Sequence, residues 1–349
     1  MDLSQAMLEA VALATDAMPH PNPRVGSVIL DAGGDVVGRG FHRGPGTPHA
    51  EVAALSEAGK RAAGGTVVAT LEPCDHHGRT PPCTEAIIRS KAARVVIGAG
   101  DPDQRVSGAG IEALREAGLE VITGVETEAA EALDPGYFHH RRTGLPLVTL
   151  KVASTLDGQV AAADGTSKWI TSEEARLDGH ILRSRSDAVL VGAGTVIADD
   201  PGLDVRIDGY EGHQPRPVIV GGSRPLPSGA KLFRRDAVVF SPAAADPPVE
   251  AISMPGPGGV DLSAMLRHLG DSGVVDLMVE GGPTLAAALL GAGLVDRLVL
   301  YLAASLGGGT GRPAFAGTFA TLSNAVPLEI TSIARIGPDL RVTCKRRRV

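Results

Sequence analysis

PHAE (residues 48–51) decides the fold of the N-terminal half, together with EPC (72–74) and PPC (81–83). His49, Cys74 and Cys83 offer three ligands for a tetrahedral zinc ion and leave its fourth position open for water. Zinc lowers the pKa of a bound water to about 7, and Glu51, two residues after the histidine, can carry the proton. The pattern predicts a zinc-dependent hydrolytic site with Glu51 as its catalytic residue.

A purely structural zinc site is the alternative to a catalytic one. Structural sites usually take four protein ligands, and no fourth cysteine lies near these three segments. His42, His76 or His77 could close the shell in that case. Either way, Pro48 and Pro82 suit the first turn of a helix, so both proline-preceded ligands are expected at helix starts.

The segments around these ligands alternate between short apolar runs and helical patterns. We expect strands at residues 25–30, 66–71, 94–97 and 120–123, and helices at 3–18, 50–58, 84–90 and 110–117. Gly118 is placed to close the last of these helices. Strand–helix alternation predicts a layered α/β domain over residues 1–144.

A second α/β domain is expected over residues 145–349. Its predicted strands are VTLKVAS, DAVLVGAG, PVIV, AVVF, DLMVEGG and RLVLYLA, and Thr171–Glu174 should open a helix. The segment 241–257 is expected to be an irregular connection. No strict G-x-G-x-x-G follows a strand, so a Rossmann dinucleotide site is not supported. The stretch EGGPT (280–284) before LAAALLGAG does offer a helix N-terminus for a phosphate.

Composition narrows the class of protein. The chain has 349 residues with a net charge of −7 and 3% aromatic residues, which argues against a nucleic-acid substrate. No apolar run is long enough to cross a bilayer, and the N-terminus is typical of a first helix and not of a signal peptide. Three cysteines, two of them in the metal motif, fit a cytoplasmic enzyme better than a secreted protein.

The eight residues between the two cysteines, DHHGRTPP, differ from the C-x-x-C of general nucleoside deaminases. EPCDHHGRTPPC, PNPRVGSVI, GRGFHRGPGTPHAEV and GDPDQRVSGAG resemble the deaminase half of the bifunctional family of bacterial riboflavin biosynthesis. The resemblance implies a cytidine-deaminase-like three-layer fold with zinc on His49, Cys74 and Cys83. Four substrate contacts are also implied: Asn22, His42, His76 and Arg79.

LKVASTLDGQVAAADGTSKWIT, LRSRSDAVLVGAGTVIADDPGLDVR and VEGGPTLAAALL resemble the reductase half of the same family. That half implies a dihydrofolate-reductase-like fold that uses NADPH to reduce the ribosyl sugar of a phosphoribosyl pyrimidine. Implied NADPH contacts are Ala153, Trp169, Thr195, Asp199, Ser223, Gly282, Pro283, Thr284, Leu285, Ala286, Ala287 and Ala288. Implied substrate contacts are Ser167, Arg183, Leu203, Arg206 and Glu280. The family's habit also suggests a homo-oligomer.

Simpler interpretations of some residues stay open. Asn22 lies between two prolines and could be a turn residue, Arg79 could be a solvated loop charge, and Trp169 could belong to the core. Asp199 could only begin a turn. Two other functions also remain: a deaminase for free nucleosides or transfer RNA, and a zinc-stabilised binding protein without turnover.

Overall fold

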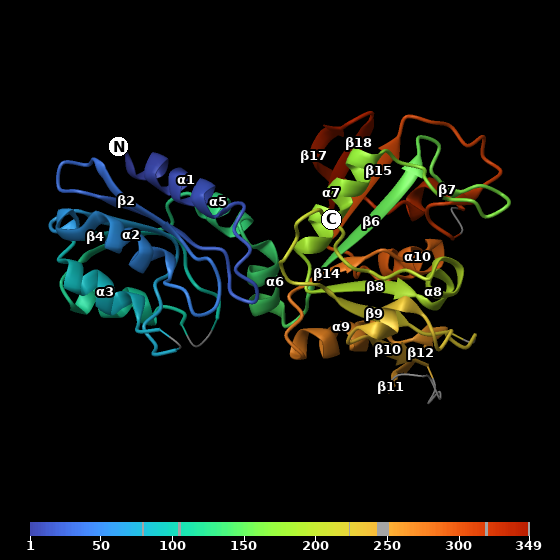
Figure 1. Cartoon of the computed structure of the whole chain (residues 1–349), viewed down its shortest axis with the longest axis horizontal. Helices are drawn as coiled ribbons and strands as arrows, with labels where there is room; N and C mark the ends of the chain where they lie inside the picture. Colours follow the sequence, from blue (N-terminus) through green and yellow to red (C-terminus); the bar gives the residue numbers. More distant parts are fainter. Residues whose placement is uncertain (79, 104–105, 223, 243–250, 318–319, 348–349) are drawn as a thin grey trace. The chain divides into compact units, whose positions relative to one another are not determined.

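The computed structural model describes residues 1–78, 80–103, 106–222, 224–242, 251–317 and 320–347 (Figure 1). The chain divides into two compact units, Met1–Thr143 and Gly144–Val349. Within the described residues, no helix combines the length and the apolar character that a membrane crossing requires.

The first unit is built around one sheet with helices on both faces. Its strands are β1 (Gly26–Leu30), β2 (Val36–Phe41), β3 (Thr66–Leu71), β4 (Arg94–Ala99) and β5 (Glu120–Thr123). Its helices are α1 (Leu3–Ala14), α2 (Ala50–Ala58), α3 (Cys83–Ser90), α4 (Ala109–Glu116), α5 (Thr127–Ala132) and α6 (Pro135–Thr143), with a short 3-10 helix at Gly59–Ala62.

The strand order is β2-β1-β3-β4-β5, antiparallel at β2-β1-β3 and parallel from β3 to β5. Successive strand residues point to opposite faces, which separates two cores. Ile29 and Val67 pack under α2, α3 and α4, whereas Val28 and Val68 pack against α1. This arrangement confirms the predicted three-layer α/β class of the first domain.

Two glycines let α2 lie directly on β2. A Cβ added to Gly38 would come within 2.2 Å of the Ala54 carbonyl oxygen, and one added to Gly40 within 2.3 Å of the Ala50 carbonyl oxygen. Only a residue without a side chain fits where two backbones approach this closely. The contact fixes the start of α2, which carries His49 and Glu51.

Most expected elements of the first unit are present, with differences at their ends. The first helix stops at Ala14 and not at Met18; Pro19 disfavours a helical conformation at Met18 only. Gly118, with φ +87°, does close α4. Strand β2 was not expected. Pro48 and Pro82 lie before the first turns, since His49 and Pro82 are the N-caps of α2 and α3.

The second unit contains, in its described residues, a nine-stranded mixed sheet and two small two-stranded sheets. Its strands are β6 (Leu147–Thr155), β7 (Gln159–Ala161), β8 (Ala188–Gly192), β9 (Arg216–Val220), β10 (Val238–Ser241), β11 (Ala251–Ser253), β12 (Pro255–Gly256), β13 (Gly259–Val260), β14 (Asp276–Val279), β15 (Arg297–Ala303), β16 (Arg312–Pro313), β17 (Leu328–Ile336) and β18 (Asp339–Arg346). Its helices are α7 (Glu173–Ser184), α8 (Ala193–Asp199), α9 (Leu262–Asp271) and α10 (Pro283–Gly291), with 3-10 helices at Lys231–Arg234 and Leu322–Asn324.

The main sheet has the order β11-β10-β9-β8-β14-β6-β15-β18-β17 in the described residues. Its strands run parallel from β11 to β15, and β18 and β17 are antiparallel. Leu190 on β8 faces the core under α9 and α10, and Val189 faces the opposite core beside α8. The α/β class predicted for this half is therefore confirmed.

The predicted irregular connection at residues 241–257 is wrong in part. Its end forms β11, which pairs with β10, and β12, which pairs with β13. The proline and glycine content concealed these strands because both are only two or three residues long. The expected helix after Thr171 is present, but Ser172 caps it by accepting the Ala175 N–H at 3.2 Å.

The close approach of α2 and β2 generates a prediction. Gly40→Ala should destabilise the first unit by about 2 kcal/mol or more, because the new methyl group collides with the backbone of α2. Gly78→Ala is the matched control, since a Cβ there would meet nothing within 4 Å. Thermal unfolding of both variants measures the difference. Equal melting temperatures would contradict the packing described here.

Candidate active site

His49, Cys74 and Cys83 meet where three elements end or begin. His49 is the N-cap of α2, Cys74 follows the end of β3, and Cys83 is the first residue of α3. His49 Nδ1 lies 3.2 Å from Cys83 Sγ and 3.5 Å from Cys74 Sγ. All three potential ligand atoms lie within 4.8 Å of one another. Ligands 2.0 to 2.3 Å from a tetrahedral zinc ion stand about 3.5 to 3.8 Å apart, so the group fits that metal.

The electrostatics of the two cysteines also fit a divalent cation. The Cys83 thiol donates a hydrogen bond to Cys74 and thereby lowers the pKa of Cys74 to about 4. The same bond, together with burial, raises the pKa of Cys83. The hydrogen bond with Cys74 raises the pKa of His49. Alone, the pair therefore holds one proton, and a cation is needed to keep both sulfurs as thiolates.

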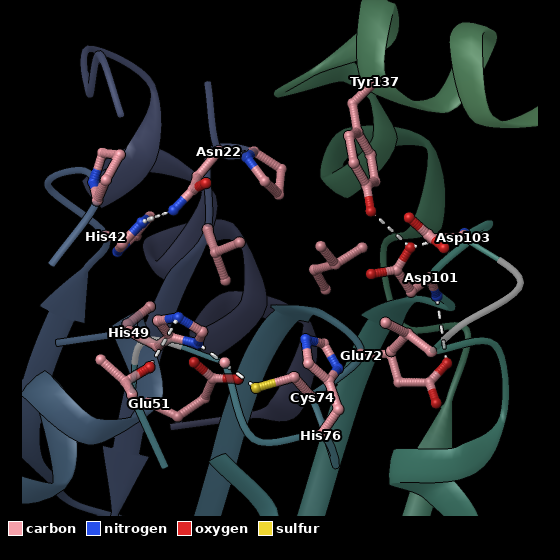
Figure 2. Close-up of a pocket in the computed structure, with 18 of the residues that line it drawn as sticks. Asn22, His42, His49, Glu51, Glu72, Cys74, His76, Asp101, Asp103 and Tyr137 are labelled. Atoms are coloured by element: carbon pink, nitrogen blue, oxygen red, sulfur yellow. Dashed lines mark hydrogen bonds between the residues drawn. The ribbon is translucent and has the colours of Figure 1, made fainter. Parts of the chain in front are cut away.

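Glu51 lies in the first turn of α2 and is 3% exposed. Burial is the main cause of its raised pKa, since it disfavours the charged carboxylate. A carboxyl group with a raised pKa is suited to accept and return a proton near neutral pH. Figure 2 shows Glu51 beside His49 and Cys74 on one side of the cavity.

The cavity has a volume of about 620 Å³. Three of the four predicted substrate contacts, Asn22, His42 and His76, line it, whereas Arg79 lies outside the described residues. Asn22 Nδ2 lies 2.8 Å from His42 Nε2, and His42 Nδ1 lies 3.2 Å from the Pro48 carbonyl oxygen. Burial is the main cause of the lowered pKa of His42. A neutral His42 that donates to the Pro48 carbonyl oxygen and accepts from the Asn22 side-chain amide satisfies both contacts. The side-chain carbonyl oxygen of Asn22 is then left for a ligand.

Glu72 is a buried residue whose role the sequence did not suggest. Its carboxylate accepts backbone N–H groups of Asp101 and Gly108 at 3.2 Å, of Gly110 at 3.2 Å and of Ile111 at 3.4 Å. These hydrogen bonds hold the start of α4 and the segment after β4 against the end of β3, close to Cys74. A glutamate directly after a buried strand was the only available signal.

The segment after β4 supplies another wall of the cavity. Tyr137 on α6 donates its hydroxyl hydrogen bond to Asp101 at 2.7 Å, and Asp101 accepts the backbone N–H of Asp103 at 2.9 Å. Burial is the main cause of the raised pKa of Asp101. Figure 2 shows Tyr137, Asp101 and Asp103 on the side of the cavity away from His49. Sequence reasoning did not assign these three residues to the site.

In the second unit, most predicted cofactor contacts lie at the carboxyl ends of neighbouring parallel strands. Ala153 is near the end of β6, Thr195 follows β8, and Gly282 follows β14 and caps α10. A Cβ on Gly282 would lie 3.8 Å from Thr195 Oγ1, so these two segments are adjacent. The remaining predicted contacts of this run, Pro283, Thr284, Leu285, Ala286, Ala287 and Ala288, form the first turns of α10. Carboxyl ends of parallel strands are where open α/β sheets bind ligands.

Trp169 and Asp199, two further predicted cofactor contacts, lie at the surface. Trp169 is 66% exposed, with the Arg176 guanidinium 4.5 Å from its ring centroid, so it does not belong to the core. Asp199 ends α8, and its carboxylate lies 3.9 Å from Lys168 Nζ. Ser223 lies outside the described residues.

Arg183 and Glu280, both predicted substrate contacts, are paired with each other. Arg183 Nε donates to Glu280 Oε1 at 2.8 Å, and Arg183 Nη1 donates to the Asp204 carbonyl oxygen at 2.5 Å. Burial alone would raise the pKa of Glu280, but Arg183 and the Lys151 ammonium group lower it overall. Most of the Arg183 guanidinium is thus already occupied by protein oxygens.

The remaining predicted substrate contacts differ in exposure. Leu203, with φ +54°, is 3% exposed and packs in the core beside α8. Arg206 is exposed and pairs with Asp204 Oδ1 at 3.0 Å, while Ser167 is half-buried. Asp157 accepts the backbone N–H groups of Gly307 and Gly308 at 2.8 Å and so stabilises a turn.

Known proteins resemble both halves of the chain. The family model for the cytidine and deoxycytidylate deaminase zinc-binding region matches residues 1–99, and the model for the RibD C-terminal domain matches residues 146–342. The riboflavin biosynthesis protein RibD of Escherichia coli is 40% identical over 340 residues, which is 92% of this chain and 92% of that protein. RibD of Aquifex aeolicus is 43% identical over 83% of each chain.

Solved structures agree with this result over the whole chain. Acinetobacter baumannii RibD superposes with a TM-score of 0.91 at 36% identity, covering 99% of both chains. A Thermotoga maritima diaminohydroxyphosphoribosylaminopyrimidine deaminase/5-amino-6-(5-phosphoribosylamino)uracil reductase superposes with a TM-score of 0.85 at 33% identity, also over 99% of both chains.

The three-ligand geometry predicts how zinc binding responds to mutation. His49→Ala should reduce bound zinc from about one ion per chain to nearly none, because two thiolates alone hold the ion weakly. His76→Ala is the control, since His76 lines the cavity but is not part of the ligand group found in the described residues. Metal analysis of the purified variants measures both. Zinc loss from His76→Ala would instead support the four-ligand structural site.

Proposed function

The chain belongs to the RibD family of bifunctional deaminase–reductases of riboflavin biosynthesis, and from this we propose its substrate and the order of its two reactions. The N-terminal domain, residues 1–144, removes the 2-amino group of 2,5-diamino-6-(5-phosphoribosylamino)pyrimidin-4-one. The C-terminal domain, residues 145–349, then reduces the ribosyl group of the product to ribityl. One observation carries the proposal: His49, Cys74 and Glu51 line a single cavity, with Cys83 beside them.

His49, Cys74 and Cys83 would hold the zinc ion of the deaminase domain. Bound zinc supplies a Lewis acid that makes a water molecule nucleophilic at neutral pH. The position of Cys83 at the start of α3 supports its ionised form, because the helix N-terminus is electropositive.

Glu51 would move the protons of the reaction. It accepts a proton from water as the new C–O bond forms at the carbon bearing the amino group, and it passes that proton to the ring nitrogen. The C–N bond then breaks, and ammonia leaves with a second proton moved by the same carboxyl group. The burial that raises the pKa of Glu51 supports this role.

The cavity wall would orient the pyrimidine. The carbonyl oxygen of Asn22, held by the contact of its amide nitrogen with His42, is suited to accept a hydrogen bond from an amino group of the substrate. His76 and Arg79 are the proposed contacts to the phosphoribosyl part, whereas His42, whose two ring nitrogens contact Pro48 and Asn22, would act by holding Asn22.

The reductase domain would bind NADPH, which supplies a hydride to C1 of the ribosyl group. Ala153, Trp169, Thr195, Asp199 and Ser223 are the proposed contacts, with Gly282–Ala288, where the free N–H groups of α10 suit a phosphate. Ser167, Leu203 and Glu280 would meet the substrate. Arg206 is better suited than Arg183 to the substrate phosphate, because Glu280 and Asp204 already occupy Arg183.

We also propose that the enzyme is a cytoplasmic homo-oligomer that binds neither nucleic acid nor membranes. Strand β17 supports self-association, since it is an edge strand with Ile330 59% and Ile333 63% exposed. An edge strand with large apolar side chains is a favourable surface for pairing with a second copy. The net charge of −7 disfavours nucleic acid.

One assay tests both reactions and their order. Given the diaminopyrimidine substrate, the wild-type enzyme should release ammonia first and consume NADPH only afterwards. In Glu51→Gln, ammonia release should fall at least about 100-fold and NADPH consumption with it, because a neutral amide cannot accept the proton. The same variant should oxidise NADPH at the wild-type rate when given the deaminated product directly.

Metal analysis of Glu51→Gln, which should keep its zinc, is the control for that assay. Wild-type ammonia release from the variant would remove Glu51 from the mechanism. Ammonia release without NADPH oxidation in the wild type would contradict the proposed reductase.

The self-association surface generates a separate prediction. Ile330→Lys combined with Ile333→Lys should shift the protein to a smaller species in sedimentation analysis, because two charges then lie on the apolar edge. Leu306→Lys is the control, being 76% exposed but outside β17. An unchanged sedimentation coefficient in the double variant would place the interface elsewhere.

A further inference from the structure

Helix α6 brings a cation to the deaminase cavity. Arg141 lines this cavity together with Tyr137, Asp101 and Asp103, and its side chain is 30% exposed. Among the described residues that line the cavity, Arg141 is the only arginine or lysine. The sequence singled out neither α6 nor Arg141 as part of the site.

Three contacts hold the guanidinium in place. Its central carbon lies 5.2 Å from the centroid of the Tyr137 ring, and Nε lies 3.1 Å from Asp103 Oδ2. Nη1 lies 2.8 Å from His140 Nδ1. The Nε–H is not aligned with the carboxylate, so this contact is an ion pair without a hydrogen bond at Nε. A guanidinium has five N–H donors, and these contacts leave donors for a ligand.

Several acidic side chains line the same cavity as the Arg141 guanidinium. Glu51, Glu72, Asp101 and Asp103 also line it, so an anion that entered would meet several carboxyl groups. Four backbone N–H groups stabilise Glu72, and Tyr137 donates to Asp101. A phosphate group still needs a positive partner, and a planar guanidinium can pair with two of its oxygens at once.

We propose that Arg141 binds the phosphate group of the deaminase substrate, on the wall away from the metal ligands. Tyr137 and Asp103 are positioning residues that hold the guanidinium against that wall. The inference rests on the proposed function, because it assumes a phosphorylated substrate in this cavity. Arg79 would be a second contact, and the experiment below does not depend on it.

The neighbouring residue provides a matched control. Arg142 also stacks on a ring, 5.1 Å from the centroid of Phe138, and its guanidinium donates to Glu131 at 2.6 and 3.0 Å. It is on the same helix and carries the same charge, but it does not line the cavity. Arg142→Ala therefore changes the net charge and a surface ion pair without changing the proposed phosphate contact.

The experiment compares ammonia release from the phosphorylated substrate and from the same compound without its phosphate. For the phosphorylated substrate, Arg141→Ala should raise KM at least about tenfold and leave kcat within about threefold, because the lost contact is with a group that does not react. Arg141→Lys should fall between Arg141→Ala and the wild type, since a lysine keeps the charge but not the two-point geometry. Arg142→Ala should match the wild type. For the compound without phosphate, Arg141→Ala and the wild type should have the same kcat/KM.

Three outcomes would overturn the inference: an unchanged KM in Arg141→Ala, an equal loss on both substrates, or the same loss in Arg142→Ala. Zinc content and thermal unfolding establish that each variant is folded. Should Arg141→Ala not fold, Arg141→Lys decides, together with competitive inhibition of the wild type by inorganic phosphate, which must weaken in that variant. A wild-type enzyme that releases no ammonia from either compound would overturn the proposed function itself, which distinguishes the two failures.

Discussion

Two cysteine sulfurs and one imidazole nitrogen lie within 4.8 Å of one another, and the fold of the deaminase unit depends on this constraint. Left alone, the two thiols hold one proton between them, with the pKa of Cys74 lowered and that of Cys83 raised. A metal ion can replace that proton only if strand β3 ends where α2 and α3 begin. Glycines in β2 allow α2 to lie close enough, and Glu51 is then buried beside the ligands as a consequence of its position in the first turn.

The opposite wall depends on a second buried acid. Glu72 follows the same strand as Cys74, and its carboxylate binds the backbone of the segment that carries Asp101 and leads into α4. A carboxylate that accepts several backbone N–H groups is stable when buried, because hydrogen bonds replace its lost hydration. The two sides of the cavity are therefore tied to one strand end, which keeps the proton-transfer side and the proposed phosphate side at a fixed separation.

The sequence predicted those parts that depend on local patterns. Ligand spacing identified His49, Cys74 and Cys83, and apolar periodicity found most strands and helices. Strand β2 was not predicted because Gly38 and Gly40, which allow α2 to lie close to this strand, interrupt its apolar pattern. The roles of Glu72 and Arg141 were not predicted for a different reason. Their partners are distant in the sequence, so only the folded backbone brings Ile111 to Glu72, or Asp103 to Arg141. The pairing of Arg183 with Glu280, 97 positions apart, could not be foreseen on the same ground.

That last pairing separates two kinds of arginine in this chain. A buried arginine whose donors already meet a carboxylate and a carbonyl oxygen can bind a new anion only by losing a partner, and the carboxylate left behind would then be buried without compensation. Arg183 is of this kind, and its pairing favours a role in shaping Glu280. Arg206 is exposed, Arg141 is partly buried, and each pairs with one aspartate among the described residues, so a phosphate can join the pair without displacing it. In the proposed function, the same phosphoribosyl group is therefore bound in both units by an arginine that an aspartate holds in position without using all of its donors.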